Sequence, residues 1–162
     1  MILEPERLGQ YFDPLFRAAW ALCGSRDDAE DLVQETFLNV LKRPRLLRDG
    51  NEIGYLMRAL RNTYSSRYRS AARRPAERQL FEDDDPADPF EPDGISAREL
   101  MEAVASAPPP YRDAVIAVDL VGLSYREAAR ALRTREATIT TRLHRGRQHV
   151  ARALSESTAT VA

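Results

Sequence analysis

DAEDLVQETFLNVLKR, residues 28–43, predicts an amphipathic helix around which the rest of the chain can be arranged. At about 100° per residue its apolar side chains fall on one side, as expected of a helix with one buried face. Ser25 suits the start of this helix, because with Asp28 three residues later it can form a capping box. Pro44 suits the end, because proline cannot continue a helix. The predicted inner face consists of Ala29, Leu32, Val33, Thr36, Phe37 and Val40.

The opposite face of this helix carries acidic and amide side chains, and Leu38 lies among them. A single exposed leucine is common on protein surfaces and needs no special explanation. Alternatively, Leu38 is an apolar anchor inside a polar surface that binds another protein. The helical pattern by itself favours the first interpretation.

Length and composition place the chain among soluble proteins of one or two small domains. Its 162 residues are 43% hydrophobic and 30% charged, with a formal net charge of −1. No apolar run of about 18 residues predicts a membrane span, and the first ten residues lack the pattern of a secretory signal. The single cysteine, Cys23, cannot form an internal disulfide, so we expect a cytoplasmic protein.

Two further helices are expected in the first half of the chain. One begins at Asp13 and Pro14, an N-cap followed by proline, and ends at Gly24. The other spans residues 53–73, where one stripe is apolar and acidic residues are absent from position 55 onward. Its opposite stripe is basic and polar, and consists of Arg58, Arg61, Asn62, Ser65 and Arg69.

The charge of that stripe supports two interpretations. A solvated helix face usually mixes charges and gains pairs of opposite sign four residues apart. A purely basic face with tyrosines nearby, such as Tyr55, Tyr64 and Tyr68, suits contacts with phosphates and stacking on bases. From the pattern alone, a basic solvated helix explains the stripe nearly as well.

Residues 76–95 separate the two halves of the chain. The segment is rich in Asp, Glu and Pro and poor in periodic apolar residues, which is typical of a flexible, extended linker. We therefore expect an all-α protein with two small helical domains, residues 1–75 and 96–156, joined by a flexible acidic linker. The residues after Leu154 are expected to fray.

A helix-turn-helix is predicted between Leu123 and Arg147. Ser124 and Glu127 suit a capping box for its first helix, and Thr134 can cap the second. The outer arc of the second helix has hydroxyl, amide and guanidinium groups and no acid, which suits hydrogen bonds to base edges in the major groove. This arc consists of Thr138, Thr140, Thr141, Arg142, His144, Arg145 and Gln148.

No signature of an enzyme or of a metal site is present in the sequence. His144 and His149 do not share a helical face, and no cysteine pair accompanies them. There is no glycine-rich phosphate loop, no GxSxG and no HExxH. The carboxylates at 83–85 lie in the predicted linker, where a rigid catalytic pair is not expected. We expect a protein that is not an enzyme and that needs no cofactor or metal.

Two stretches of the chain resemble one known family. DAEDLVQETF, residues 28–37, closely resembles conserved region 2 of bacterial RNA polymerase sigma factors of the extracytoplasmic-function (ECF, group IV) branch. Residues 123–147 resemble region 4 of the same family, above all from Thr138 to Arg145. The pair occurs in the expected order, separated by the acidic segment. The resemblance implies an alternative sigma factor that binds core RNA polymerase and directs promoter-specific transcription initiation.

The resemblance also implies a role for each surface. The helix of residues 28–43 would bind the coiled coil of the largest polymerase subunit, with Leu38 as an anchor. The basic stripe and Tyr55 would engage and help open the −10 promoter element, with the loop of residues 49–54 as a candidate for base selection. The C-terminal arc would recognise the −35 element. The polymerase contacts that follow by position are Asp28, Asp31, Gln34, Glu35, Leu38 and Asn39.

The partners that the resemblance implies are core RNA polymerase, including the flap of its second subunit, promoter DNA, and an anti-sigma factor that covers the same faces. Three residues depart from the usual family pattern: Tyr55 replaces a tryptophan, Thr140 a basic residue and Arg133 the glycine of the turn. The turn position often needs a positive φ, so a non-glycine residue there costs about 1 kcal/mol.

Two other classes of protein fit the helix-turn-helix alone. A dimeric helix-turn-helix regulator that acts without polymerase would form a homodimer and bind its operator tightly by itself. A protein-interaction adaptor would show no sequence-selective DNA binding under any condition.

Overall fold

The computed structural model describes residues 1–48, 50–73 and 95–161. Within these residues the chain is helical, as predicted, apart from an isolated antiparallel bridge between Ile2 and Leu46. Most of the predicted linker and Asp49 of the predicted base-selection loop lie outside the described residues. The elements are α1 (Pro5–Leu8), η1 (Gly9–Tyr11), α2 (Phe12–Cys23), α3 (Arg26–Lys42), α4 (Glu52–Arg73), α5 (Ala97–Ala105), α6 (Pro109–Val115), η2 (Ile116–Leu120), α7 (Tyr125–Ala131) and α8 (Glu136–Val161).

The helix predicted at residues 28–43 is α3, and its inner face is confirmed. The Ser25 hydroxyl accepts a hydrogen bond from the Asp28 backbone N–H at 3.4 Å, and the helix ends at Lys42, shortly before Pro44. Phe37 is half-buried, and the other predicted inner residues are buried. The buried Thr36 hydroxyl donates to the Leu32 carbonyl oxygen at 2.7 Å, which satisfies its polar atom inside the core.

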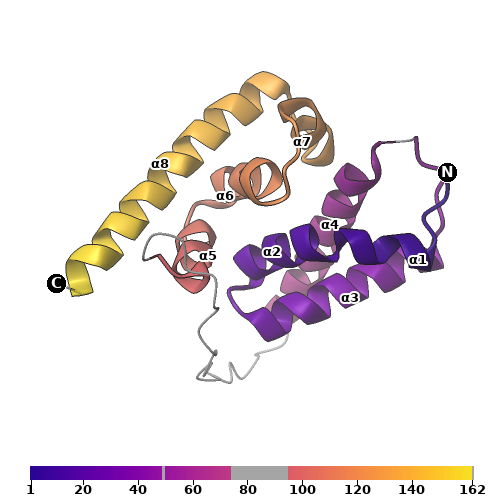
Figure 1. Ribbon diagram of the computed structural model, residues 1–162, viewed down its shortest axis with the longest axis horizontal. Helices are drawn as coiled ribbons and strands as arrows, with labels where there is room; N and C mark the ends of the chain where they lie inside the picture. The colour runs from indigo at the N-terminus through magenta and orange to yellow at the C-terminus, as the bar shows by residue number, and fades with distance from the viewer. Residues whose placement is uncertain (49, 74–94, 162) are drawn as a thin grey trace.

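The helix α2 begins at Phe12, two residues before the predicted first residue Pro14, because the 3-10 turn η1 leads directly into it, so Asp13 lies inside the helix and is not its N-cap. It ends at Gly24, as predicted, and this glycine has the left-handed conformation, with φ 74°. The short turn then reverses the chain, so that α2 and α3 pack side by side, with α4 against both (Figure 1).

The C-terminal group begins with α5, and two of its helices carry complete capping boxes. In α7 the Glu127 N–H donates to the Ser124 hydroxyl at 3.1 Å, and the Ser124 N–H donates to the Glu127 carboxylate at 2.8 Å. The same reciprocal pair links Ser96 and Glu99 at the start of α5. The predicted capping box of the helix-turn-helix is therefore confirmed.

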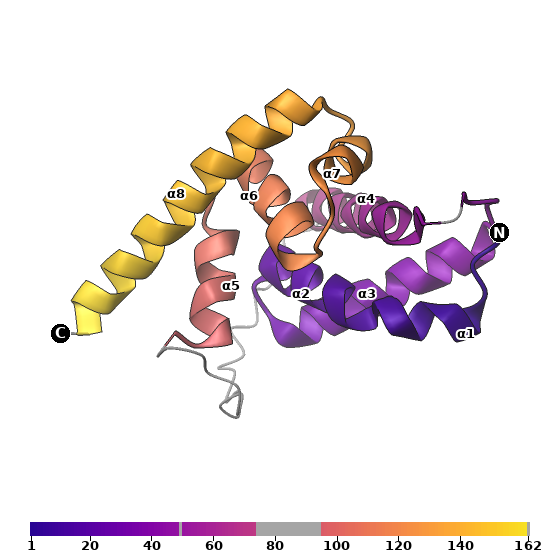
Figure 2. The same ribbon diagram turned by 45° about the horizontal axis from the view of Figure 1, so that its top comes forward.

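The long helix α8 runs along the outer edge of this group (Figure 2). It starts at Glu136, two residues after the predicted cap Thr134. It continues to Val161, so the residues after Leu154, where fraying was expected, are helical in the structure. Hydroxyl groups along this last stretch donate to backbone carbonyls one turn earlier, for example from Ser155 to Ala151 at 2.9 Å.

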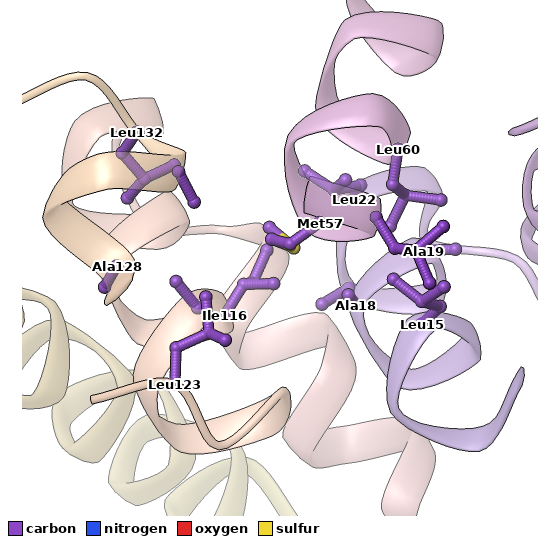
Figure 3. Packing of buried hydrophobic residues seen from close by; sticks show 14 of the residues in the cluster. Leu15, Ala18, Ala19, Leu22, Met57, Leu60, Ile116, Leu123, Ala128 and Leu132 are labelled. Carbon is purple, nitrogen blue, oxygen red and sulfur yellow. The ribbon is translucent and has the colours of Figure 1, made fainter. Parts of the chain in front are cut away.

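The buried apolar residues of both groups of helices form one continuous cluster. Met57 of α4 lies between side chains of the first group, such as Leu22, and Ile116 of the second (Figure 3). α2 packs against α5 and η2, and α4 packs against α7. Burial of apolar surface is the main favourable term in folding, so this shared core holds the two groups together in the described arrangement.

Candidate polymerase-binding and nucleic-acid-binding surfaces

The predicted polymerase contacts lie on the outer face of α3. Five of the six are exposed, and Leu38 is 55% exposed among carboxylate and amide groups. Glu35 is half-buried and forms an ion pair with Arg67 of α4. Asn39 is near α4 as well, because its amide lies 3.5 Å from the Thr63 hydroxyl. The middle of the face therefore exposes the Leu38 side chain to a partner, whereas Glu35 and Asn39, at the side of the face next to α4, contact residues of α4.

The predicted basic stripe lies on α4, but it is not a free face. Asn62 and Arg69 are exposed, whereas Tyr55, Arg58, Arg61 and Ser65 are half-buried. The cause is tertiary: the C-terminal group packs on this side of α4 and covers part of the stripe. Arg58 and Asn62 line a groove, and Arg61 is engaged with a residue of the C-terminal group.

Arg61 forms an ion pair between the two groups of helices. Its Nε donates to the Asp113 carboxylate of α6 at 2.9 Å, and the Asp113 residue is only 7% exposed. Arg112 also donates to this carboxylate, at 3.3 Å, and its guanidinium lies 5.7 Å from the centre of the Tyr64 ring. The sequence pattern gave no indication of a role for Asp113, because there it is a single acidic residue among apolar ones. In this arrangement Asp113 forms an ion pair with Arg61, which was predicted to contact DNA.

A groove of about 530 Å³ lies beside this contact, where α3, α4 and the turn between α7 and α8 meet. The half-buried Tyr55 and the amides of Asn39 and Asn62 also line it. The charged groups on its lining are one carboxylate, Glu35, and five cations. We call it the basic groove, and its cations are Lys42, Arg43, Arg45, Arg58 and Arg133.

The predicted outer arc of the helix-turn-helix lies on α8. Thr140, Thr141, His144, Arg145 and Gln148 are exposed, and Thr138 and Arg142 are half-buried. The hydroxyls of Thr140 and Thr141 donate to carbonyls one turn earlier, which leaves their oxygens able to accept hydrogen bonds from base edges. Arg145 donates to the Tyr111 hydroxyl at 2.9 Å. Of the inner residues predicted for this helix, Ile139, Leu143 and Gly146 are buried, whereas Val150 is half-buried.

Arg147, next to this arc, is tied to its own group of helices. Its guanidinium donates twice to the Asp119 carboxylate of η2, at 3.0 and 2.7 Å. This hydrogen bonding with Asp119 raises the pKa of Arg147. The pair fixes the side of α8 that faces η2 and leaves the outer arc open.

The turn between α7 and α8 has the backbone that the family pattern predicts. Arg133 has a φ of 53°, which makes it the sole non-glycine residue with a positive φ in the described part of the chain. The turn geometry is therefore kept although glycine is absent, and the strain expected from the sequence is present.

Other features of the described residues do not form a reactive centre. Burial, reinforced by Asp28, raises the pKa of the Cys23 thiol to about 12, so it is protonated at neutral pH and a poor nucleophile. In residues 1–48, 50–73 and 95–161 no group of His, Cys, Asp and Glu side chains could hold a metal ion. None of the helices in these ranges has the length and apolar character to cross a membrane.

Comparisons with known proteins match both halves of the chain. The model of Sigma-70 region 2 matches residues 8–74, and that of Sigma-70 region 4 matches residues 97–150. The ECF RNA polymerase sigma factor SigE of Mycolicibacterium smegmatis is 36% identical over 152 residues, which are 90% of this chain and 59% of that protein. EcfG of Rhodopseudomonas palustris is 32% identical over 143 residues, which are 83% of this chain and 76% of that protein.

Solved structures share the fold. The sigma factor RpoE from Bartonella quintana, solved with the anti-sigma factor NepR, superposes with a TM-score of 0.74 over 93% of this chain and 95% of that one, at 24% identity. CnrH, solved with the cytosolic domain of CnrY, gives a TM-score of 0.65 over 93% of this chain and 86% of that one, at 20% identity. The region 2 and region 4 matches, together with the likeness to EcfG over three quarters of its length, show that this chain belongs to the family of ECF RNA polymerase sigma factors.

Proposed function

We propose that this protein is an alternative sigma factor that binds core RNA polymerase and directs transcription initiation at specific promoters. The observation that carries the proposal is the occurrence of both sigma regions, in order, on one chain. The exposed Leu38 on the polar face of α3 supports polymerase binding through that helix. The exposed polar and basic arc of α8 supports recognition of the −35 element in the major groove.

The division of labour follows from these surfaces. Residues 1–75 form the region 2 domain, which binds polymerase and engages the −10 element. Residues 96–156 form the region 4 domain, and residues 76–95 link the two. Polymerase carries out the bond chemistry, so this chain acts in the cytoplasm as a specificity subunit and not as an enzyme. An anti-sigma factor is a further partner, in line with the complex in which RpoE was solved.

This function requires the two domains to separate. Elements at −10 and −35 lie about 25 base pairs apart, or about 85 Å at about 3.4 Å per base pair. In the described arrangement Arg58 of α4 and Arg133, in the turn before α8, line the same groove, so the two groups of helices that would each bind one promoter element are packed together. The packed form is therefore a closed state, and the form that binds a promoter is open.

Asp113→Asn is expected to shift the protein towards the open state. The change keeps the size of the side chain but removes the negative charge that Arg61 contacts across the interface. Because Arg61 is partly solvated, we expect a loss of about 1–2 kcal/mol for the closed state. Small-angle X-ray scattering of the full chain should then show a radius of gyration larger by about 2–5 Å, since the two groups of helices would spend more of the time apart.

The matched control is Asp119→Asn, which breaks an ion pair of the same kind within the C-terminal domain, between η2 and α8. It should leave the radius of gyration at the wild-type value. Equal scattering curves for wild type and Asp113→Asn would show that this ion pair does not hold the domains together.

Arg142→Ala and Arg145→Ala are each expected to weaken binding to the upstream promoter element by about 1–3 kcal/mol, because each removes a guanidinium from the arc that faces the DNA. The measurement is a footprinting titration with reconstituted holoenzyme. Arg152→Ala is the control, because it removes the same charge from an exposed position further along α8. If all three variants protect the upstream element from cleavage equally well, Arg142 and Arg145 do not contact the DNA.

In vitro transcription tests the proposed function as a whole. Core polymerase, a library of promoter fragments and the purified protein should give transcripts from defined start sites, which are absent when the protein is left out. A dimeric helix-turn-helix regulator would instead bind its operator tightly without polymerase and would not confer start sites on the core enzyme. An absence of new start sites would overturn the sigma factor proposal.

A further inference from the structure

The basic groove concentrates positive charge that the protein does not neutralise. Its lining has five cations and one carboxylate, Glu35, and that carboxylate is already paired with Arg67. Within residues 1–48, 50–73 and 95–161 none of the five cations forms an ion pair or donates a side-chain hydrogen bond. Like charges around one cavity repel each other, so the closed state is penalised unless an anion lies among them.

One of these cations is held in place by a strained backbone. Arg133 is contributed by the C-terminal domain, whereas Lys42, Arg43, Arg45 and Arg58 belong to the N-terminal domain. Its φ of 53° would suit glycine, which the family pattern usually has at this position. An unfavourable conformation that the surrounding structure maintains is a recognised sign of a functional position. Here the residue that causes the strain also adds the cation that completes the groove.

The neutral groups of the groove indicate the kind of anion. The amides of Asn39 and Asn62 can donate hydrogen bonds to oxygen atoms or to the edge of a base, and Tyr55 offers an aromatic ring. The volume of about 530 Å³ lies within the range usual for small-molecule sites. Guanidinium groups bind phosphate oxygens in a bidentate manner, so a cluster of arginines favours a ligand with phosphate groups.

We propose that the basic groove binds the phosphate groups of a nucleoside polyphosphate, and that this ligand stabilises the closed state by joining Arg133 to α3 and α4. The inference rests on the proposed function in one respect: Tyr55, Arg58 and Asn62 are also proposed contacts of the −10 element. A bound ligand therefore blocks these contacts while it holds the domains together. Opening removes Arg133 from the site, so polymerase and promoter binding release the ligand.

The first test is isothermal titration of the full chain with inorganic pyrophosphate and with GTP. Wild type should bind both. Arg133→Gly should bind both about ten-fold more weakly, the effect of losing one charge-assisted contact. This variant should fold at least as well as wild type, because glycine relieves the strain at the turn. Arg152→Ala, which removes one exposed positive charge elsewhere on α8, should bind as wild type does.

Two further titrations test whether the phosphates come from a nucleotide or from a nucleic acid, and whether binding requires the closed state. A short single-stranded oligonucleotide replaces GTP in one arm, and Asp113→Asn replaces wild type in the other. Weaker binding of GTP by Asp113→Asn supports a site that exists only in the closed state. The proposal is overturned if pyrophosphate and GTP do not bind, if Arg133→Gly binds them as wild type does, or if the oligonucleotide alone binds. Neither polymerase nor promoter is present, so these results are independent of the sigma factor test.

Discussion

Leu38→Asp is expected to abolish binding of this protein to core RNA polymerase while its fold is unchanged. Leu38 is 55% exposed on α3, so the new carboxylate is solvated in the free protein and costs the fold only about 0.5–1 kcal/mol, through the lower helix propensity of Asp and its repulsion with Glu35. In the complex the same carboxylate would be buried without a partner at the centre of the proposed interface. Central apolar anchors contribute about 2 kcal/mol or more, so affinity should fall at least about thirty-fold.

The measurement is a binding titration with labelled protein and core polymerase, with circular dichroism to verify the fold. Leu46→Asp is the matched control, because Leu46 is 81% exposed but lies outside α3. It should bind as wild type does. Normal assembly of holoenzyme with Leu38→Asp would contradict the assignment of this face of α3 to polymerase.

Gly146→Ala is expected to destabilise the fold by about 1–3 kcal/mol, although alanine normally favours a helix by about 1 kcal/mol over glycine. A Cβ at this position would lie 2.7 Å from the Tyr111 carbonyl oxygen and 2.5 Å from Val115 Cγ2. The backbone of α6 cannot yield unless α6 and α8 move apart, which would open the core of the C-terminal domain. Thermal unfolding should show a lower midpoint, by about 2–4 °C for each kcal/mol.

Gly9→Ala is the control for this substitution. Gly9 also has a negative φ, and a Cβ there would have no atom within 4 Å. The control should leave the unfolding midpoint unchanged or raise it slightly. If both variants unfold at the wild-type temperature, the close approach of α6 and α8 at Gly146 is not a constraint on the protein.

Local signals in the sequence predicted the elements well. The Ser124 and Glu127 capping box, the stop at Gly24 and the apolar stripe of α3 each depend on residues within one or two turns of each other, so the pattern contains all that is needed. The residues after Leu154 were expected to fray, but in the structure they continue the helix to Val161, with hydroxyl groups that donate to the carbonyls one turn earlier.

The candidate surfaces were predicted less completely. Leu38 and most of the outer arc of α8 are exposed as expected, whereas Thr138 and Arg142 of the arc are half-buried. The basic stripe of α4 was expected to be a free face, but Arg61 contacts Asp113, which is 52 residues away in the chain. No helical period relates two residues at that separation, and an acid among apolar residues does not indicate its partner. The ion pair of Glu35 with Arg67 was missed for the same reason.

The sequence by itself determined where the long helices lie, which face of α3 is buried and which family the chain resembles, because capping and amphipathic periodicity are properties of neighbouring residues. Only the tertiary structure decided that the two domains share one apolar core, that Asp113 forms an ion pair with Arg61 and that Arg133 and Arg58 line the same groove. Such contacts depend on how separate elements pack to remove apolar surface from water, and that balance is a property of the whole chain.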